Sequence, residues 1–329
     1  MAKVWPDALT NHNQMLAQQA QQAQQAERVW QAMPEAWKEQ LHTCWLPLAS
    51  HLAEFSEQYK ATHHQPAIVG IHGGQGSGKS TLCRALADLY QQAFNWKVAV
   101  ISIDDLYLTK HERQNLASEI HPLLATRGVP GTHDVVTGSE LFQQLRTLGS
   151  NKYLNYPAFD KISDDRCPQD EWHGISGPVD LILFEGWCVG CQAADNTELQ
   201  QPVNDLEQQE DSNGLWRQWV NDQLKDHYQP WFAQIDYLLM LKVPDIESVN
   251  QWRSQQERDN EKLSSNSQAA SGMTDAQIRR FVQHYQRLTE RALRDMPGYA
   301  DLILELNNQH QVSAVHYNQT QVISVEESV

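Results

Sequence analysis

A cluster of glycines between an apolar run and a helical pattern constrains the fold of this 329-residue chain more than any other feature. Residues 67–71 are almost entirely apolar, as in a fully buried strand, and apolar residues recur at helical spacing from Leu82 to Leu89. The segment between them therefore joins a strand to the N-terminus of a helix. Its glycines allow backbone N–H groups to curl around an anion, and the helix dipole adds positive potential there. The segment is predicted to bind phosphate.

The same segment fills every position of the pattern G-x-x-x-x-G-K-[ST], from Gly73 to Ser80. Lys79 supplies a full positive charge for the β- and γ-phosphates of a nucleotide, and the Ser80 hydroxyl can bind Mg²⁺. A chance match in a glycine-rich turn is the alternative, but it leaves the flanking strand and helix unexplained. The predicted nucleotide-binding residues are Gly73, Gly74, Gln75, Gly76, Ser77, Gly78, Lys79, Ser80 and Thr81.

Composition limits the partners of the chain. A formal net charge of −16 argues against DNA or an anionic membrane surface as a partner, whereas a small phosphorylated ligand remains compatible with the local charge of the loop. The longest apolar runs are too short to span a bilayer, and residues 1–13 lack a signal-peptide core. We therefore expect a cytoplasmic protein that binds a small molecule, with no nucleic-acid or membrane partner. Its oligomeric state is left open.

The five cysteines do not suggest a disulfide framework, because their number is small and odd. Cys188 and Cys191 form a C-x-x-C pair, but no second pair or nearby histidine completes a zinc site. We expect both to be buried as small apolar side chains.

The order of apolar segments predicts an α/β fold. Five short, buried strands alternate with helical patterns, which is typical of a parallel five-stranded sheet with helices on both faces. These strands are expected at residues 68–71, 98–103, 181–184, 237–243 and 302–306.

Two further segments lie outside this alternation. Residues 1–60 are predicted to form a helical N-terminal extension, and 61–329 a single P-loop domain. Residues 193–213 are acidic and poor in apolar side chains, so they are predicted to form a mobile surface insertion.

Acidic residues follow two of the predicted strands. Asp104 and Asp105 come after the second strand, and Glu185 comes after the third. Because the carboxyl ends of parallel strands meet at one edge, these acids are expected near the phosphate loop. There an Asp can accept a proton from an attacking hydroxyl, and an acid after an apolar strand can orient the ligands of a metal. A solvated turn or a helix cap is the alternative for Asp104 and Asp105.

Two loops rich in glycine, proline and charge lie between these strands. Residues 127–134 (RGVPGTHD) offer Arg127, His133 and Asp134, and residues 155–166 (NYPAFDKISDDR) offer Lys161 and Arg166. Such groups suit a small polar or anionic substrate. Ordinary surface loops held by local ion pairs are the alternative.

Taken in order, these segments resemble a known family. The series GGQGSGKST, SIDDLYLT, RGVPGTHD, PAFDKISDDR, LILFEGWCVGC, QWRSQQE and GMTDAQIRRFV is similar to the plant and fungal D-glycerate 3-kinases and their bacterial relatives. These belong to the P-loop kinases, which also include pantothenate kinase, uridine kinase and phosphoribulokinase. The resemblance covers residues 66–306.

The resemblance implies ATP- and Mg²⁺-dependent phosphorylation of a hydroxyl on a small molecule. It places the catalytic base on Asp104 and a Trp-Arg helix, Trp252 and Arg253, over the phosphates. The catalytic set is then Lys79, Asp104, Glu185 and Arg253, with Ser80 and Glu185 at the metal. The acceptor-binding set is Asp105, Tyr107, Arg127, His133, Asp134, Lys161 and Arg166.

A helical pattern near residues 245–271 is expected to act as a lid that closes over bound ATP. A solvated helix with ordinary i,i+4 ion pairs is the alternative.

The chain departs from the plant pattern where it has Ile162-Ser163-Asp164 in place of Gly-Arg-Gly, and where it has Cys188 and Cys191. Its acidic insertion has no counterpart. D-Glycerate is thus the first expected acceptor, and pantothenate or a nucleoside remain alternatives. A nucleotide-dependent switch or ATPase is a rival, but it does not explain the Asp104-Asp105 pair, and neither does a non-enzymatic binding module.

Overall fold

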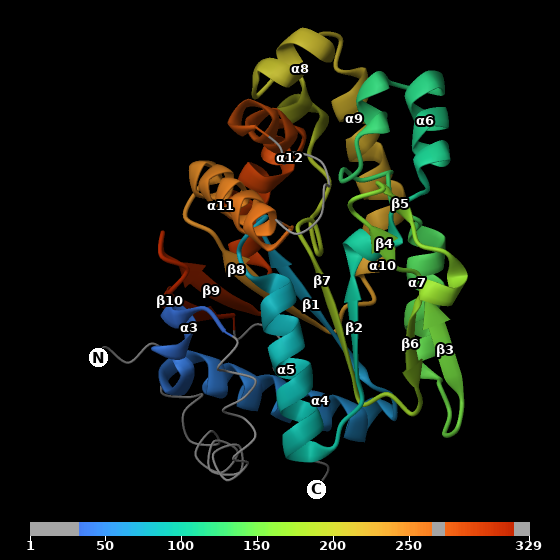
Figure 1. The fold of residues 1–329 in the computed structure, drawn as a ribbon, viewed down its shortest axis with the longest axis vertical. Coiled ribbons are helices and arrows are strands. Elements are labelled where there is room, and N and C mark those ends of the chain that lie inside the picture. Colours follow the sequence, from blue (N-terminus) through green and yellow to red (C-terminus); the bar gives the residue numbers. More distant parts are fainter. Residues whose placement is uncertain (1–32, 265–273, 319–329) are drawn as a thin grey trace, which may run out of the picture.

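The computed structural model describes residues 33–264 and 274–318 and is centred on a six-stranded sheet in the order β10-β9-β8-β1-β7-β2 (Figure 1). The strands are β1 (Ala67–Gly73), β2 (Val98–Ser102), β7 (Leu181–Gly186), β8 (Tyr237–Lys242), β9 (Leu302–Leu306) and β10 (Val312–Tyr317). The first five pair in parallel, and each falls where the sequence predicts a strand.

The predicted count of five parallel strands needs a correction, because β10 adds a sixth strand, antiparallel to β9. Only Val312 and Val315 of β10 are buried, and its other side chains are partly or fully exposed. An edge strand of this kind lacks the continuous apolar run by which the central strands were recognised.

Helices cover both faces of the sheet, as predicted (Figure 1). Successive residues of β1 point to opposite faces, so Val69 packs in one cluster and Ile68 in the other. The first cluster contains side chains of α4 (Leu46–His63), α5 (Lys79–Phe94) and α11 (Ile246–Ser264). The second contains side chains of α7 (Val135–Arg146), α10 (Gln229–Phe232) and α12 (Asp275–Asp295).

The remaining elements are two short antiparallel strand pairs and a set of short helices. Two short antiparallel pairs are formed by β3 (Tyr153–Tyr156) with β6 (His173–Ser176) and by β4 (Phe159–Asp160) with β5 (Asp165–Arg166). The short helices are η3 (Ile103–Leu106), α6 (Lys110–Glu119), η4 (Pro122–Ala125), η5 (Gln169–Glu171), η6 (Asn196–Leu199), α8 (Asp205–Glu210), α9 (Leu215–Gln223), η7 (Leu224–Tyr228) and η8 (Met296–Gly298).

The N-terminal extension is helical where the structure describes it. It consists of α3 (Glu35–Lys38), a π-helical turn η2 (Leu41–Trp45) and α4, which runs to His63. Residues 1–32 lie outside the described part. Trp37 and Trp45 are buried in the same core as β1 and α5, so the described extension is an integral layer of the fold.

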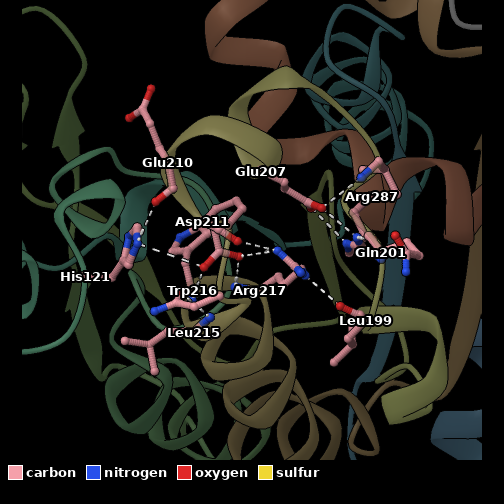
Figure 2. A network of polar contacts seen from close by, with 12 residues as sticks. His121, Leu199, Gln201, Glu207, Glu210, Asp211, Leu215, Trp216, Arg217 and Arg287 are labelled. Atoms are coloured by element: carbon pink, nitrogen blue, oxygen red, sulfur yellow. Dashed lines mark hydrogen bonds and ion pairs between the residues drawn. The ribbon is translucent and has the colours of Figure 1, made fainter.

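Residues 193–213, predicted to be mobile, are folded instead. They form η6 and α8, and Leu199 and Leu206 are buried. Figure 2 shows how the acidic side chains are neutralised: the Asp211 carboxylate lies 2.9 Å from Arg217 Nη1 and accepts two backbone N–H groups, while Glu207 pairs with Arg287 of α12 at 2.6 Å. Composition misled because it counted these acids as solvated charges, whereas Asp211 and Glu207 are buried and paired with Arg217 and Arg287.

Within the described ranges, no helix has both the length and the apolar character needed to cross a bilayer.

Candidate active site

The predicted phosphate loop connects β1 to α5, whose first residue is Lys79. Gly76 and Gly78 have φ angles of 77° and 92°, which side chains rarely tolerate. A Cβ atom on Gly78 would lie 2.7 Å from the ring of Trp37, and one on Gly76 would lie 2.8 Å from Cβ of Trp252. The extension and α11 therefore pack directly against the outside of the loop.

Lys79 bonds back to the loop, and Ser80 connects the loop to the neighbouring strand β7. Lys79 Nζ donates a hydrogen bond to the Gly74 carbonyl at 3.1 Å, and Ser80 Oγ donates to Glu185 Oε1 at 2.6 Å. Burial lowers the pKa of Lys79, while the negative charges of Glu185 and Asp104 act in the opposite direction. The charge of Lys79 thus interacts with two carboxylates, Glu185 on β7 and Asp104 just after β2.

The loop and the end of β7 fit a nucleotide with a divalent cation. Gly76 and Gly78 adopt positive φ angles in this loop, and Ser77 Oγ is buried without a hydrogen-bond partner in the described part of the chain. Ser80 Oγ and the carboxylate of Glu185, which is only 4% exposed, are hard oxygen donors. No set of three or more His, Cys, Asp or Glu side chains in the described ranges could hold a metal. Phosphate oxygens and water would have to complete the shell, as is usual for Mg²⁺.

Asp104 follows Ser102 by two residues, and Ser102 pairs in register with Glu185 on β7. Asp104 therefore lies near Glu185. Its carboxylate accepts hydrogen bonds from Tyr107 Oη at 2.7 Å and from Lys161 Nζ at 2.6 Å. Burial alone would raise the pKa of Asp104, but the charge and hydrogen bond of Lys161 outweigh it and hold that pKa below its ordinary value. Asp104 is therefore ionised at neutral pH.

Asp105 faces different partners. Its carboxylate accepts the backbone N–H of Phe159 at 3.4 Å and lies 3.4 Å from Nε2 of His173 on β6. The hydrogen bond that the His173 ring donates to Asp105 raises the pKa of His173. Asp105 thus contacts one strand of each short antiparallel pair, β4 and β6, and its predicted role at the acceptor stays a prediction.

The loop at 127–134 divides the predicted acceptor residues into two groups. Arg127 pairs with Asp164, which lies in the turn between β4 and β5. Asp134 instead caps α7 by accepting the Thr137 N–H at 3.0 Å, and Arg166 donates to the Tyr107 carbonyl at 2.9 Å. Asp134 and Arg166 therefore hold the loop in place in this structure, and their predicted contact with the acceptor stays a prediction.

His133 is buried and stacks on Tyr107 with ring centroids 4.5 Å apart. Burial lowers its pKa to about 3, so the ring is neutral. The Tyr228 hydroxyl accepts two backbone N–H groups, from Gly131 and His133, and therefore donates to His133 Nδ1 at 2.7 Å. The proton of the imidazole consequently lies on Nε2, which has no hydrogen-bond partner within the described part of the chain.

The predicted lid is helical from Ile246 to Ser264, and the rest of 245–271 lies partly outside the described residues. Trp252 stacks on His310 at 3.9 Å, and His310 Nε2 lies 3.1 Å from the Gly76 carbonyl. The Arg253 guanidinium lies 5.9 Å from the ring centroid of Phe281 on α12. In this conformation Arg253 is thus held between the two helices.

Three residues, Trp37, His310 and Asp164, contribute to the site although no pattern in the sequence indicated it. Trp37 donates its indole N–H to the carbonyl of His310 at 3.0 Å, which links the extension to the residue that contacts the loop. No local pattern relates Trp37 to glycines about forty residues later in the chain.

Comparison with known proteins places this geometry in a family, although no family model matches the chain. The chain is 33% identical over 278 residues to the uncharacterized kinase mug58 of Schizosaccharomyces pombe, covering 82% of this chain and 91% of that protein. It is 30% identical over 229 residues to the chloroplastic D-glycerate 3-kinase of Arabidopsis thaliana, covering 67% of this chain and 46% of that protein.

A solved structure gives the same result. The D-glycerate 3-kinase from Cryptococcus neoformans var. grubii superimposes with a TM-score of 0.67 at 25% identity, over 82% of this chain and 99% of the other. The shared fold, the phosphate loop and the level of identity agree with one another. The chain belongs to the P-loop small-molecule kinases related to D-glycerate 3-kinase.

Proposed function

We propose that this kinase uses ATP and Mg²⁺ to phosphorylate D-glycerate to 3-phosphoglycerate. The observation that carries the proposal is the ionised carboxylate of Asp104, which is paired with Lys161, while Asp164 of the same turn is paired with Arg127. Two similar proteins are named D-glycerate 3-kinase, which supports this choice of acceptor.

On the phosphate side, the backbone of the loop and Lys79 would hold the β- and γ-phosphates. Ser80 and Glu185 would bind Mg²⁺, which contributes charge neutralisation when bound. Arg253 would approach the transferring group from α11, as the resemblance implies. These roles require positioning and charge rather than covalent chemistry by the protein.

On the acceptor side, Asp104 would accept the proton of the attacking hydroxyl. The hydroxyl oxygen bonds to the γ-phosphorus, the bond to the β,γ-bridging oxygen breaks, and ADP leaves. Arg127 is suited to a carboxylate, and the neutral His133 offers an N–H donor at Nε2. A small hydroxy acid can bind both groups, whereas an uncharged acceptor offers Arg127 no anion. We further propose that the protein acts in the cytoplasm.

A coupled assay of ADP release tests the proposal with D-glycerate, L-glycerate, glycerol, pantothenate and uridine as acceptors, followed by mass spectrometry of the product. We expect D-glycerate to give the highest kcat/KM and a product one phosphate heavier. If uridine or pantothenate exceeded D-glycerate tenfold, the assignment of the acceptor would be rejected, while the kinase family would stand.

A further inference from the structure

The turn between β4 and β5, residues 161–164, contributes two opposite charges to the acceptor side. Lys161 reaches the Asp104 carboxylate at 2.6 Å, and Asp164 pairs with the guanidinium of Arg127. Side chains of the turn thus form ion pairs with both the proposed base, Asp104, and the proposed anion-binding residue, Arg127. We call residues 161–164 the acceptor turn.

The acceptor turn is well formed yet lies at the surface. The carboxylate of Asp160 accepts the backbone N–H groups of Ile162 and Ser163 at 2.9 and 3.1 Å, which fixes the start of the turn. Asp164 has a φ of 58°, and the Ile162 side chain is 90% exposed. The turn therefore presents preformed charges to the site from the solvent side.

Asp164 contacts two guanidinium groups of different character. Arg113 is 1% exposed and is satisfied by the carbonyls of Leu108 and Ala125, and by both the carbonyl and carboxylate of Asp164. Arg127 keeps 21% of its side chain exposed. Ion pairs between partly exposed groups contribute little to stability. A ligand can therefore replace Asp164 at Arg127 while Asp164 keeps its contacts with Arg113.

We propose that Asp164 is a specificity-determining residue that occupies the position of the acceptor's anionic group on Arg127. A small hydroxy acid displaces it, places its carboxylate on Arg127, and brings its hydroxyl to Asp104 in the place of Lys161. Acceptors with an anion must compete with Asp164, whereas neutral acceptors bind without touching Arg127. This inference rests on the proposed function, because it assigns the acceptor to the same site.

Removing the charge of Asp164 should strengthen the binding of D-glycerate, because the acceptor carboxylate then no longer competes with Asp164 for Arg127. Asn tolerates a positive φ better than most residues and keeps an acceptor oxygen for Arg113, so Asp164→Asn should fold normally. The KM for D-glycerate should fall about threefold to fivefold, the range expected for one partly exposed ion pair. The kcat should stay within about twofold, and the KM for glycerol should not change.

Two further variants separate this role from structural effects. Asp164→Gly also accepts the positive φ and should reproduce the fall in KM. Asp170→Asn removes the same charge from an exposed turn, η5, and should leave both acceptors unchanged. Equal changes in KM for D-glycerate and glycerol would identify Asp164 as a structural counter-ion of Arg113. A KM for D-glycerate that stayed constant or rose in Asp164→Asn would also overturn the inference.

An inhibition measurement separates failure of the inference from failure of the proposed function. D-Lactate carries the carboxylate of D-glycerate but lacks the terminal hydroxyl, so it can compete for Arg127 without being phosphorylated there. Its inhibition constant is measured against whichever acceptor the screen identifies. If D-glycerate is not a substrate but D-lactate inhibits Asp164→Asn more strongly than the parent protein, only the proposed acceptor is wrong. Equal inhibition of both proteins would reject the role of Asp164.

Discussion

The two halves of the site are held together in different ways. On the phosphate side, Trp37 and Trp252 pack directly on glycines of the loop, and Glu185 is almost completely buried. On the acceptor side, contacts between ionised groups dominate, and Lys161 and Asp164 keep 59% and 31% of their side chains exposed. Close packing keeps the phosphate loop in one geometry, whereas the partly exposed ion pairs of the acceptor side can exchange partners with a substrate.

The largest expected effect is at Asp104, where the two halves meet. Asp104→Asn removes the proposed base and should lower kcat by about 10²–10⁴-fold, while the affinity for ATP changes little. Asp105→Asn is the matched control, because that carboxylate binds Phe159 and His173. Steady-state kinetics and nucleotide titration measure both. A larger loss of kcat in Asp105→Asn would move the base by one residue.

The next effect concerns Lys79. Lys79→Ala should remove on the order of 3 kcal/mol of transition-state stabilisation, comparable to the loss of one oxyanion donor. The measurement is kcat/KM for ATP, with circular dichroism to check folding. Activity within threefold of the parent protein would contradict the assignment of the phosphate loop.

A smaller effect should reveal whether packing from the extension reaches the loop. Trp37→Phe keeps an aromatic ring against Gly78 but loses the hydrogen bond to the His310 carbonyl, at a cost of about 0.5–1.5 kcal/mol. We expect the KM for ATP to rise severalfold and the KM for the acceptor to stay constant.

The chain offers a matched control in Trp45→Phe. Trp45 is also fully buried and stacks on Trp37, but its indole nitrogen has no hydrogen-bond partner in the described structure. This variant should leave the KM for ATP unchanged. If both variants raised it equally, general loosening of the core would explain the effect.

The smallest effect at neutral pH concerns Lys161, which holds the pKa of Asp104 low. With the pKa depressed, Asp104 stays ionised as the pH falls, so kcat/KM should show no acid limb from this group in the ordinary carboxyl range. Lys161→Gln removes the opposing charge and leaves burial, which raises the pKa. The acid limb of kcat/KM should then move to higher pH. Coincident pH profiles for the two proteins would show that Lys161 does not control the ionisation of Asp104.

The same difference between the halves explains what the sequence could predict. The phosphate loop and five strands were predicted because their signals are local: glycines at fixed spacing and continuous apolar runs. Strand β10 was missed because half of it faces solvent.

The acceptor side was harder to predict because its partners come from distant segments. Asp104 and Asp105 are adjacent in sequence, yet one meets Lys161 and the other meets His173. Asp134 and Arg166 were predicted at the acceptor, but the sequence did not indicate that Asp134 caps a helix or that Arg166 contacts a backbone carbonyl. Which charges pair with one another depends on tertiary structure.

The ion pairs formed by residues 193–213 limit which single substitutions this sequence can accept during evolution. Losing one member of Asp211–Arg217 or Glu207–Arg287 leaves an uncompensated buried charge, at a cost of about 3–5 kcal/mol. That cost is a large share of the 5–15 kcal/mol by which a typical domain is stable. Replacing both members with apolar residues can be nearly neutral. Descendants of this chain should therefore retain or exchange each pair as a unit, so the two positions of each pair should covary.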